Sequence, residues 1–167
     1  MFTPSHLGLG IFLGALTLNF FNFWAVLLGS FVADLEPIFL VISRHCYKCP
    51  HHGFLHSILG AILGSLILAL VLWLIRDKLN KLSLKIKIRQ SFSFGNLFFS
   101  SLFGWVLHVF FDSFTHNDVF LFWPLQENPL LIGKEIYWPL TIIFSAFGFL
   151  GIFILYKRIK AGDKMKV

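Results

Sequence analysis

The sequence predicts an all-α fold: a polytopic membrane helical bundle of about five hydrophobic helices, beginning with a short helical hairpin. Hydrophobic residues make up 57% of the 167 residues and charged residues only 13%, against about 25% charged residues in typical soluble domains. The 22 phenylalanines would make a very large core for a soluble protein of this size. A chain of this length normally forms one domain, so we expect a single transmembrane domain over residues 1–160 and a basic cytoplasmic tail over 161–167.

The hairpin is predicted at the N-terminal end. Asn19 and Asn22 interrupt the segment LNFFNFW and leave two shorter apolar runs, over about 7–18 and 23–35. We expect the chain to turn near these asparagines, with the two limbs either crossing the membrane as tilted short spans or forming a re-entrant pair. Non-helical backbone at membrane depth is tolerated where protein covers it.

Three longer apolar segments follow, over residues 54–75, 95–116 and 136–156. Each is close to the roughly 20 residues that cross about 30 Å of hydrocarbon. We therefore expect three spanning helices after the hairpin.

The basic residues predict the orientation. Eleven of the 14 lysines and arginines lie in Arg76–Arg89 and Lys157–Lys166, both beside apolar spans. The positive-inside rule puts such segments in the cytoplasm, and anionic lipid headgroups, rather than nucleic acid, are their expected partner. We expect a multi-pass plasma membrane protein whose loops 43–53 and 117–135 face outside.

This topology brings several polar residues to one level. The midpoint between His6 and Asp34 falls in the predicted hairpin turn, so the two should lie at equal depth. The midpoint between His56 and His108 falls in the basic segment, which predicts the same for that pair. Residues four apart share a helix face, so His108, Asp112 and His116 can point at a common axis near the extracytoplasmic side.

Such a cluster predicts a metal. An aspartate in an apolar span costs about 3 kcal/mol unless it is paired, and imidazole and carboxylate are ordinary ligands of divalent first-row ions. We expect one or two divalent ions, zinc being the first choice. Simpler interpretations stay open: His45 and His116 as polar groups at the membrane interface, and the Asp34–Pro37 segment as an ordinary helix end.

The segment RHCYKCPHHGFLHSI holds four histidines and two cysteines in fifteen residues. Cys46 and Cys49 could form a disulfide or remain structural thiols, could supply half of a structural zinc site, or could have no special role. We do not place them in the catalytic site. His51 or His52, together with His56, is expected at the metal site.

Several motifs together carry a family resemblance: the N-terminal FTPSH, GSFVADLEP after the second apolar run, PHHGFLHS, LHVFFDS and FWPLQENPLL. In this order the chain resembles the YdjM-like, or LexA-regulated, membrane-bound metal-dependent hydrolases, and a related group of archaeal membrane proteins, over about residues 2–132. The resemblance implies a helical membrane bundle with a metal site. Its motifs fall on His6, on Asp34 and Glu36, on His51–His56, and on His108 and Asp112. Glu36 stands where the family usually has aspartate, and His52 replaces an arginine.

The leading hypothesis is a metal-dependent hydrolase that acts on a lipid or lipid-linked ester or phosphoester near the outer membrane surface. Asp34 or Glu36 would act as the general base. A metal or proton transporter and a metal-stabilised scaffold protein are the alternatives, and the apolar inner halves of the spans favour the enzyme over the transporter. Tyr137 and Trp138 fit an interfacial aromatic belt. The candidate ligands are His6, Asp34, Glu36, His51, His52, His56, His108 and Asp112.

Overall fold

The computed structural model describes residues 3–44 and 51–161, and these residues form helices, turns and loops without a strand. The prediction of an all-helical fold is therefore confirmed. The helices are α1 (Thr3–Leu16), α2 (Phe23–Gly29), α3 (Leu35–Arg44), α4 (Ile58–Leu74), α5 (Arg76–Lys85), α6 (Phe94–Ser113) and α7 (Tyr137–Ala161), with 3-10 turns η1 (Val32–Asp34), η2 (Phe54–His56) and η3 (Lys134–Ile136).

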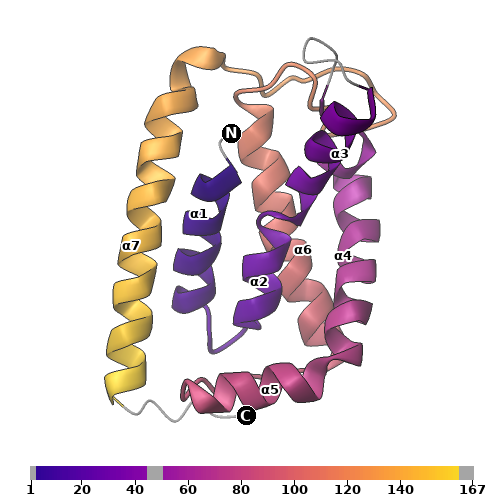
Figure 1. Cartoon of the computed structure of the whole chain (residues 1–167). Helices are drawn as coiled ribbons and strands as arrows, with labels where there is room; N and C mark the ends of the chain where they lie inside the picture. Colours follow the sequence, from indigo (N-terminus) through magenta and orange to yellow (C-terminus); the bar gives the residue numbers. More distant parts are fainter. Residues whose placement is uncertain (1–2, 45–50, 162–167) are drawn as a thin grey trace.

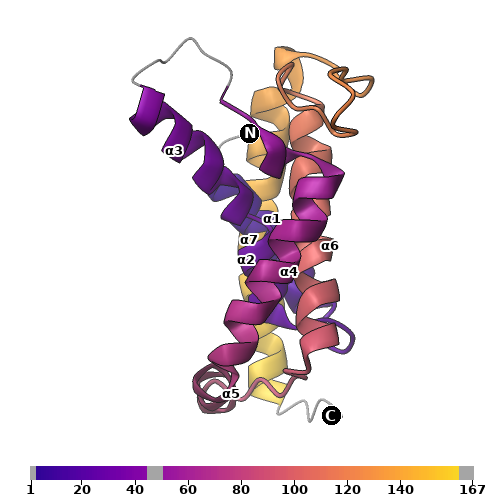
Figure 2. The same ribbon diagram turned by 90° about the vertical axis from the view of Figure 1, so that its right-hand side faces the viewer.

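Helices α1, α2, α4, α6 and α7 run side by side along the long axis of the molecule, and α5 lies across one end (Figure 1). Helix α1 packs against α7 and α2, while α6 packs against α2 and α4. Helix α3 continues the direction of α2 but leans away from the other helices (Figure 2). Helix α6 therefore joins the N-terminal hairpin to α4.

Within the described residues, three helices are long and apolar enough to cross a membrane: Phe23–Ser43, Phe94–Ser113 and Lys134–Lys160. A fourth span results if α4 and α5, which bend by 73° at their junction, are counted as one. Large apolar side chains cover the outside of the bundle; Phe149 is 77% exposed and Ile142 66%. Such a surface requires lipid around it, in agreement with the predicted membrane bundle.

The hairpin turns between Leu16 and Phe23, where Asn19 and Asn22 predicted a turn. Asn22 caps α2 by accepting a hydrogen bond from the backbone N–H of Ala25. Its side-chain amide donates to the carbonyl of Ser91, and its backbone N–H donates to the hydroxyl of Ser100. One polar group before α6 and one within α6 thus hold the turn in place. Buried polar groups need such partners, because leaving them without a hydrogen bond is costly.

The second limb of the hairpin differs from the prediction. Instead of ending near residue 35, it breaks at η1 and continues as α3 to Arg44. Pro37 lies in the first turn of α3, where its missing N–H leaves no helical hydrogen bond unmade. Proline therefore helps to begin a helix here, and Asp34 and Glu36 lie at a break between two helices. The basic segment after residue 75 also differs, since it contains helix α5.

Small residues let the helices approach closely. A Cβ atom added at Gly8 of α1 would collide with the carbonyl oxygen of Phe144 in α7, and one added at Gly104 of α6 would collide with that of Val26 in α2. Close approach through glycine is common between membrane helices. Because His108 lies one turn after Gly104, the α2–α6 contact also determines how near His108 comes to the end of α2.

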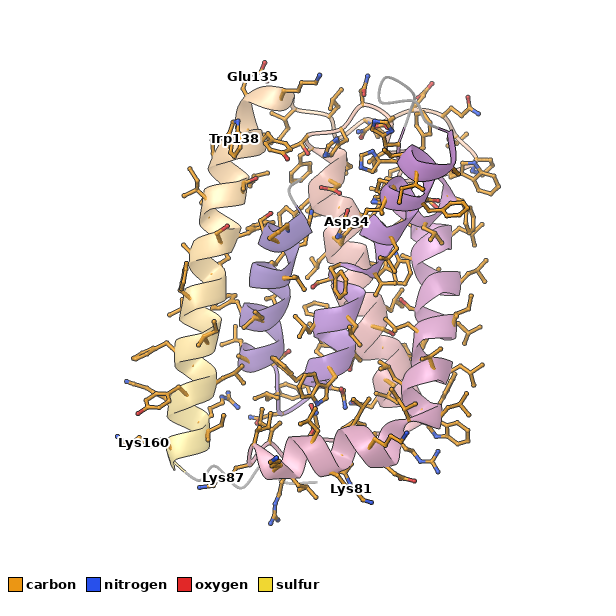
Figure 3. All side chains as sticks on the ribbon, viewed as in Figure 1. Asp34, Lys81, Lys87, Glu135, Trp138 and Lys160 are labelled. Atoms are coloured by element: carbon orange, nitrogen blue, oxygen red, sulfur yellow. The ribbon has the colours of Figure 1, made fainter. Side chains whose placement is uncertain are left out.

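The two ends of the bundle differ in chemistry (Figure 3). Lys81, Lys87 and Lys160 lie at the end formed by α5 and the end of α7, whereas Glu135 and Trp138 lie at the opposite end. The two basic segments therefore share one end, as the topology predicted. Asp34 lies inside the bundle in the half nearer to Glu135.

Candidate metal centre

Four buried side chains converge between α2, α4 and α6: Asp34, His56, His108 and Asp112. One ligand atom from each lies within 4.8 Å of the corresponding atom of every other. Asp34 comes from η1, His56 from η2, and the remaining two from α6. Three segments far apart in the sequence thus supply one compact group of imidazoles and carboxylates.

Local structure positions each member. Asp34 ends η1, at the break that separates α2 from α3. His56 ends η2, and the following residue, Ser57, caps α4 by accepting a hydrogen bond from the backbone N–H of Gly60 at 2.9 Å. His108 and Asp112 are one helical turn apart on the buried face of α6, as their spacing predicts.

His108 lies at the centre of the group. Its Nε2 is 3.3 Å from Oδ2 of Asp112, 3.5 Å from Oδ1 of Asp34 and 3.3 Å from Nε2 of His56. Nε2 of His56 is 3.9 Å from the same Asp34 oxygen and 3.9 Å from the same Asp112 oxygen. Two imidazole nitrogens and two carboxylate oxygens therefore surround one small space.

A second layer of hydrogen bonds fixes these ligands from behind. His56 donates from Nδ1 to Oε2 of Glu36 at 2.9 Å, and His108 donates from Nδ1 to the backbone carbonyl of Ser30 at 2.8 Å. His6 donates from Nε2 to Oδ1 of Asp112 at 3.1 Å. Histidines that bind metals almost always donate their other N–H to an oxygen in this way.

This donor set fits a divalent cation. Because His56 and His108 each use their Nδ1–H on an oxygen outside the group, their neutral forms present two Nε2 lone pairs to each other across 3.3 Å. Oδ2 of Asp34 is buried and has no hydrogen-bond partner. Lone pairs and carboxylate oxygens in such a space require a cation or added protons, since burying them alone is costly. Imidazole and carboxylate are suitable ligands for zinc and similar ions.

Three other predicted ligands, Glu36, His6 and His51, lie outside the group of four. Glu36 accepts hydrogen bonds from the backbone N–H groups of Gly53 and Leu55 at 3.0 and 3.1 Å as well as from His56, so both its oxygens are engaged. His6 lies behind Asp112. The side chain of His51 belongs to neither group of converging ligand atoms among the described residues.

A second group contains two predicted ligands, His52 and Asp112, and one residue whose role the sequence left open, His116. Ligand atoms of His52, Asp112 and His116 also lie within 4.8 Å of one another. His52 donates from Nδ1 to Oδ1 of Asp118 at 2.9 Å. The sequence signal for His116 was its spacing of four from Asp112, but nothing in the sequence singled out Asp118. His45, Cys46 and Cys49 lie outside the described residues.

Two side chains that follow α6, those of His116 and Asp118, have shifted pKa values. Burial lowers the pKa of His116 to about 4, so its imidazole is neutral at physiological pH. For Asp118, burial alone raises the pKa. Hydrogen bonds from His52 and from the backbone N–H groups of His51 and His52 outweigh it and hold the pKa well below its usual value. Asp118 therefore stays ionised.

Comparison with family models identifies the chain. The model of the YdjM inner membrane protein family matches residues 1–166, so the chain belongs to this family, as the sequence resemblance implied. It is a multi-pass plasma membrane protein, as the apolar spans and basic segments predicted. Comparisons with curated proteins and with solved structures find no match for this chain.

Proposed function

We propose that this member of the YdjM inner membrane protein family is a metal-dependent hydrolase that acts on a lipid or lipid-linked ester or phosphoester. The observation that carries the proposal is the buried group of Asp34, His56, His108 and Asp112. It lies in an apolar bundle and is backed by a second layer of hydrogen bonds. Burying ionisable side chains in hydrocarbon is costly. A functional role for a bound metal ion therefore explains this group better than a contribution to stability alone.

A divalent ion held there, with zinc as the first choice, would act as a Lewis acid toward an ester or phosphoryl oxygen and lower the pKa of water. The four residues of the group would hold the ion. Glu36 and Ser30 would orient the two histidines through their Nδ1 atoms, and His6 would orient Asp112.

Asp34 is the best candidate for the general base. Oδ1 of Asp34, which faces His108, would bind the ion. A base must have an acceptor atom within reach of the reacting group, and Oδ2 of Asp34 is a second, buried oxygen without a hydrogen-bond partner. Both oxygens of Glu36 already accept hydrogen bonds from the backbone or from His56. We therefore assign proton transfer to Asp34 rather than to Glu36.

The surroundings favour a substrate that belongs to the membrane. Trp138 is 67% exposed at the end of the bundle nearer to the site, and aromatic side chains of this kind mark headgroup depth. Helix α3, which begins beside Asp34, also exposes apolar side chains, among them Phe39 and Ile42. Membrane lipids are thus the natural partners, with the scissile bond at headgroup level. Nucleic acid is not expected as a partner.

A transporter is less well supported. Transport needs polar groups that continue to the other face. In the described part of the chain, the buried ionisable side chains are His6, Asp34, His56, His108 and Asp112, all in or beside the one cluster. Toward the α5 end, the buried polar residues are Asn22 and several serines, such as Ser65 and Ser101. This arrangement favours a site entered from one side.

Metal analysis of the detergent-purified protein, followed by a hydrolysis screen on extracted lipids, tests the proposal. We expect the wild type to retain a divalent ion in stoichiometric amount and His108→Ala to lose it. His51→Ala serves as the matched control, because its side chain is outside both ligand groups. Hydrolysis that depends on His108 supports the enzyme. Absence of bound metal from the wild type, or ion uptake into sealed vesicles without hydrolysis, would overturn it.

A further inference from the structure

We propose that a second divalent cation binds beside the first, between His52, Asp112 and His116, so that Asp112 is shared by two ions. This inference rests on the proposed function, since it extends the same centre. A pair of ions clamps the attacking and leaving oxygens of a displacement at phosphorus. Of the substrates in the proposed function, a two-ion centre would therefore suit the phosphoester of a lipid or lipid-linked group.

The side chains of His52, Asp112 and His116 converge beside the first group, where α6 ends. His116 lies one turn after Asp112, and its backbone N–H donates to the Asp112 carbonyl at 3.0 Å, so the helical geometry of α6 continues to it. The ring of His52 lies 4.4 Å from that of His116 and 4.5 Å from that of His56, measured between centroids. His52 thus lies between the two groups.

The histidines of the two groups are held in the same way. His52 donates from Nδ1 to Asp118 at 2.9 Å, just as His56 donates from Nδ1 to Glu36 at 2.9 Å. Each carboxylate is itself fixed by backbone N–H groups, those of His51 and His52 for Asp118. A carboxylate that orients a histidine in this way is typical of metal sites. With Nδ1 engaged, Nε2 of His52 is the atom that can bind an ion.

Asp112 connects the two groups. One of its oxygens accepts a hydrogen bond from His6 and the other lies 3.3 Å from Nε2 of His108. It is also the only member common to the two sets of converging ligand atoms found among the described residues. A carboxylate has two oxygens and can serve two cations at once. This explains why a single fully buried aspartate is surrounded by histidines from several segments.

The test uses the full chain in detergent or lipid nanodiscs, made metal-free with a chelator and then titrated with Mn²⁺. Bound Mn²⁺ is measured by elemental analysis, and the coupling between ions by electron paramagnetic resonance. We expect two equivalents with the spectrum of a coupled pair in the wild type. His116→Ala should bind one uncoupled equivalent, and His51→Ala, the matched control, should bind two coupled equivalents.

The outcomes separate this inference from the proposed function. A wild type that binds one equivalent, lost in His108→Ala and kept in His116→Ala, overturns the second ion and leaves the hydrolase proposal intact. A wild type that binds none overturns both. If His116→Ala fails to fold, Asp118→Asn carries the test: it should weaken the second equivalent by about 10- to 100-fold and leave the first unchanged. Equal weakening of both equivalents, or of neither, would contradict the assignment.

Discussion

Glu36 accepts a hydrogen bond from Nδ1 of His56 at 2.9 Å, while the opposite nitrogen of that ring lies 3.3 Å from Nε2 of His108. A carboxylate at the start of α3 thus orients an imidazole that precedes α4. Because the backbone N–H groups of Gly53 and Leu55 bind the same carboxylate, Glu36 determines the position of the whole segment that carries His56.

The first prediction concerns this contact. Glu36→Ala removes the acceptor of the His56 ring and of two backbone N–H groups, but none of the four converging ligands. We expect metal affinity to fall by about 10- to 100-fold, as is usual when an orienting carboxylate is lost. Competition with a chromophoric chelator measures it. Glu127→Ala, a change at an exposed acid in the loop between α6 and α7, should leave affinity unchanged. Complete loss of metal would instead identify Glu36 as a direct ligand.

The second prediction concerns stability. A ligand that binds only the folded state raises the free energy of unfolding by RT ln(1 + [L]/Kd), where [L] is the concentration of free ligand. We therefore expect a chelator to lower the Tm of the wild type in detergent, and excess metal to restore it. His108→Ala should start from a lower Tm and respond to either addition less than the wild type does, because Nε2 of His108 lies at the centre of the first group and its loss leaves only the second cation to respond. An equal chelator effect on the variant would contradict the assignment.

The third prediction links helix packing to the site. A Cβ atom at Gly104 would collide with the carbonyl oxygen of Val26 and approach the backbone N of Ser30. Gly104→Ala should therefore separate α2 from α6, destabilise the protein by about 1–3 kcal/mol and lengthen the bond between His108 and the Ser30 carbonyl. Metal retention and thermal unfolding measure both effects.

The control for this packing prediction lies on the same helix. Gly95 has open space where a Cβ atom would be, so Gly95→Ala should fold normally and keep its metal. If Gly95→Ala and Gly104→Ala reduce stability and metal retention equally, separation of α2 from α6 is not the cause.

The fourth prediction concerns orientation. The positive-inside rule puts the end that carries Lys160 in the cytoplasm and the end that carries Glu135 outside. Single cysteines at these two positions, in a chain whose Cys46 and Cys49 are replaced by serine, can be labelled in whole cells with a membrane-impermeant maleimide. We expect Glu135→Cys to be labelled directly and Lys160→Cys only after permeabilisation. The reverse pattern would move the site to the cytoplasmic side.

The sequence alone predicted the features that depend on local periodicity and composition. The apolar content indicated a membrane bundle, Asn19 and Asn22 indicated the hairpin turn, and the spacing of His108 and Asp112 indicated a shared helix face. These predictions succeed because 3.6 residues per turn and the length of a span are properties of neighbouring residues. The equal depth of His56 and His108, whose Nε2 atoms lie 3.3 Å apart, also followed, because helices of similar length return to similar levels.

Tertiary structure decided the roles within the cluster. Asp34 and Glu36 are two residues apart and chemically alike, yet one faces His108 and the other lies behind His56. The difference comes from the break at η1, which the sequence pattern did not reveal. Asp118 lies in a loop without periodicity, so only the folded chain brings it to His52. Composition and spacing determine which residues reach one depth in the membrane. Contacts between distant segments determine which atom of each residue faces the centre.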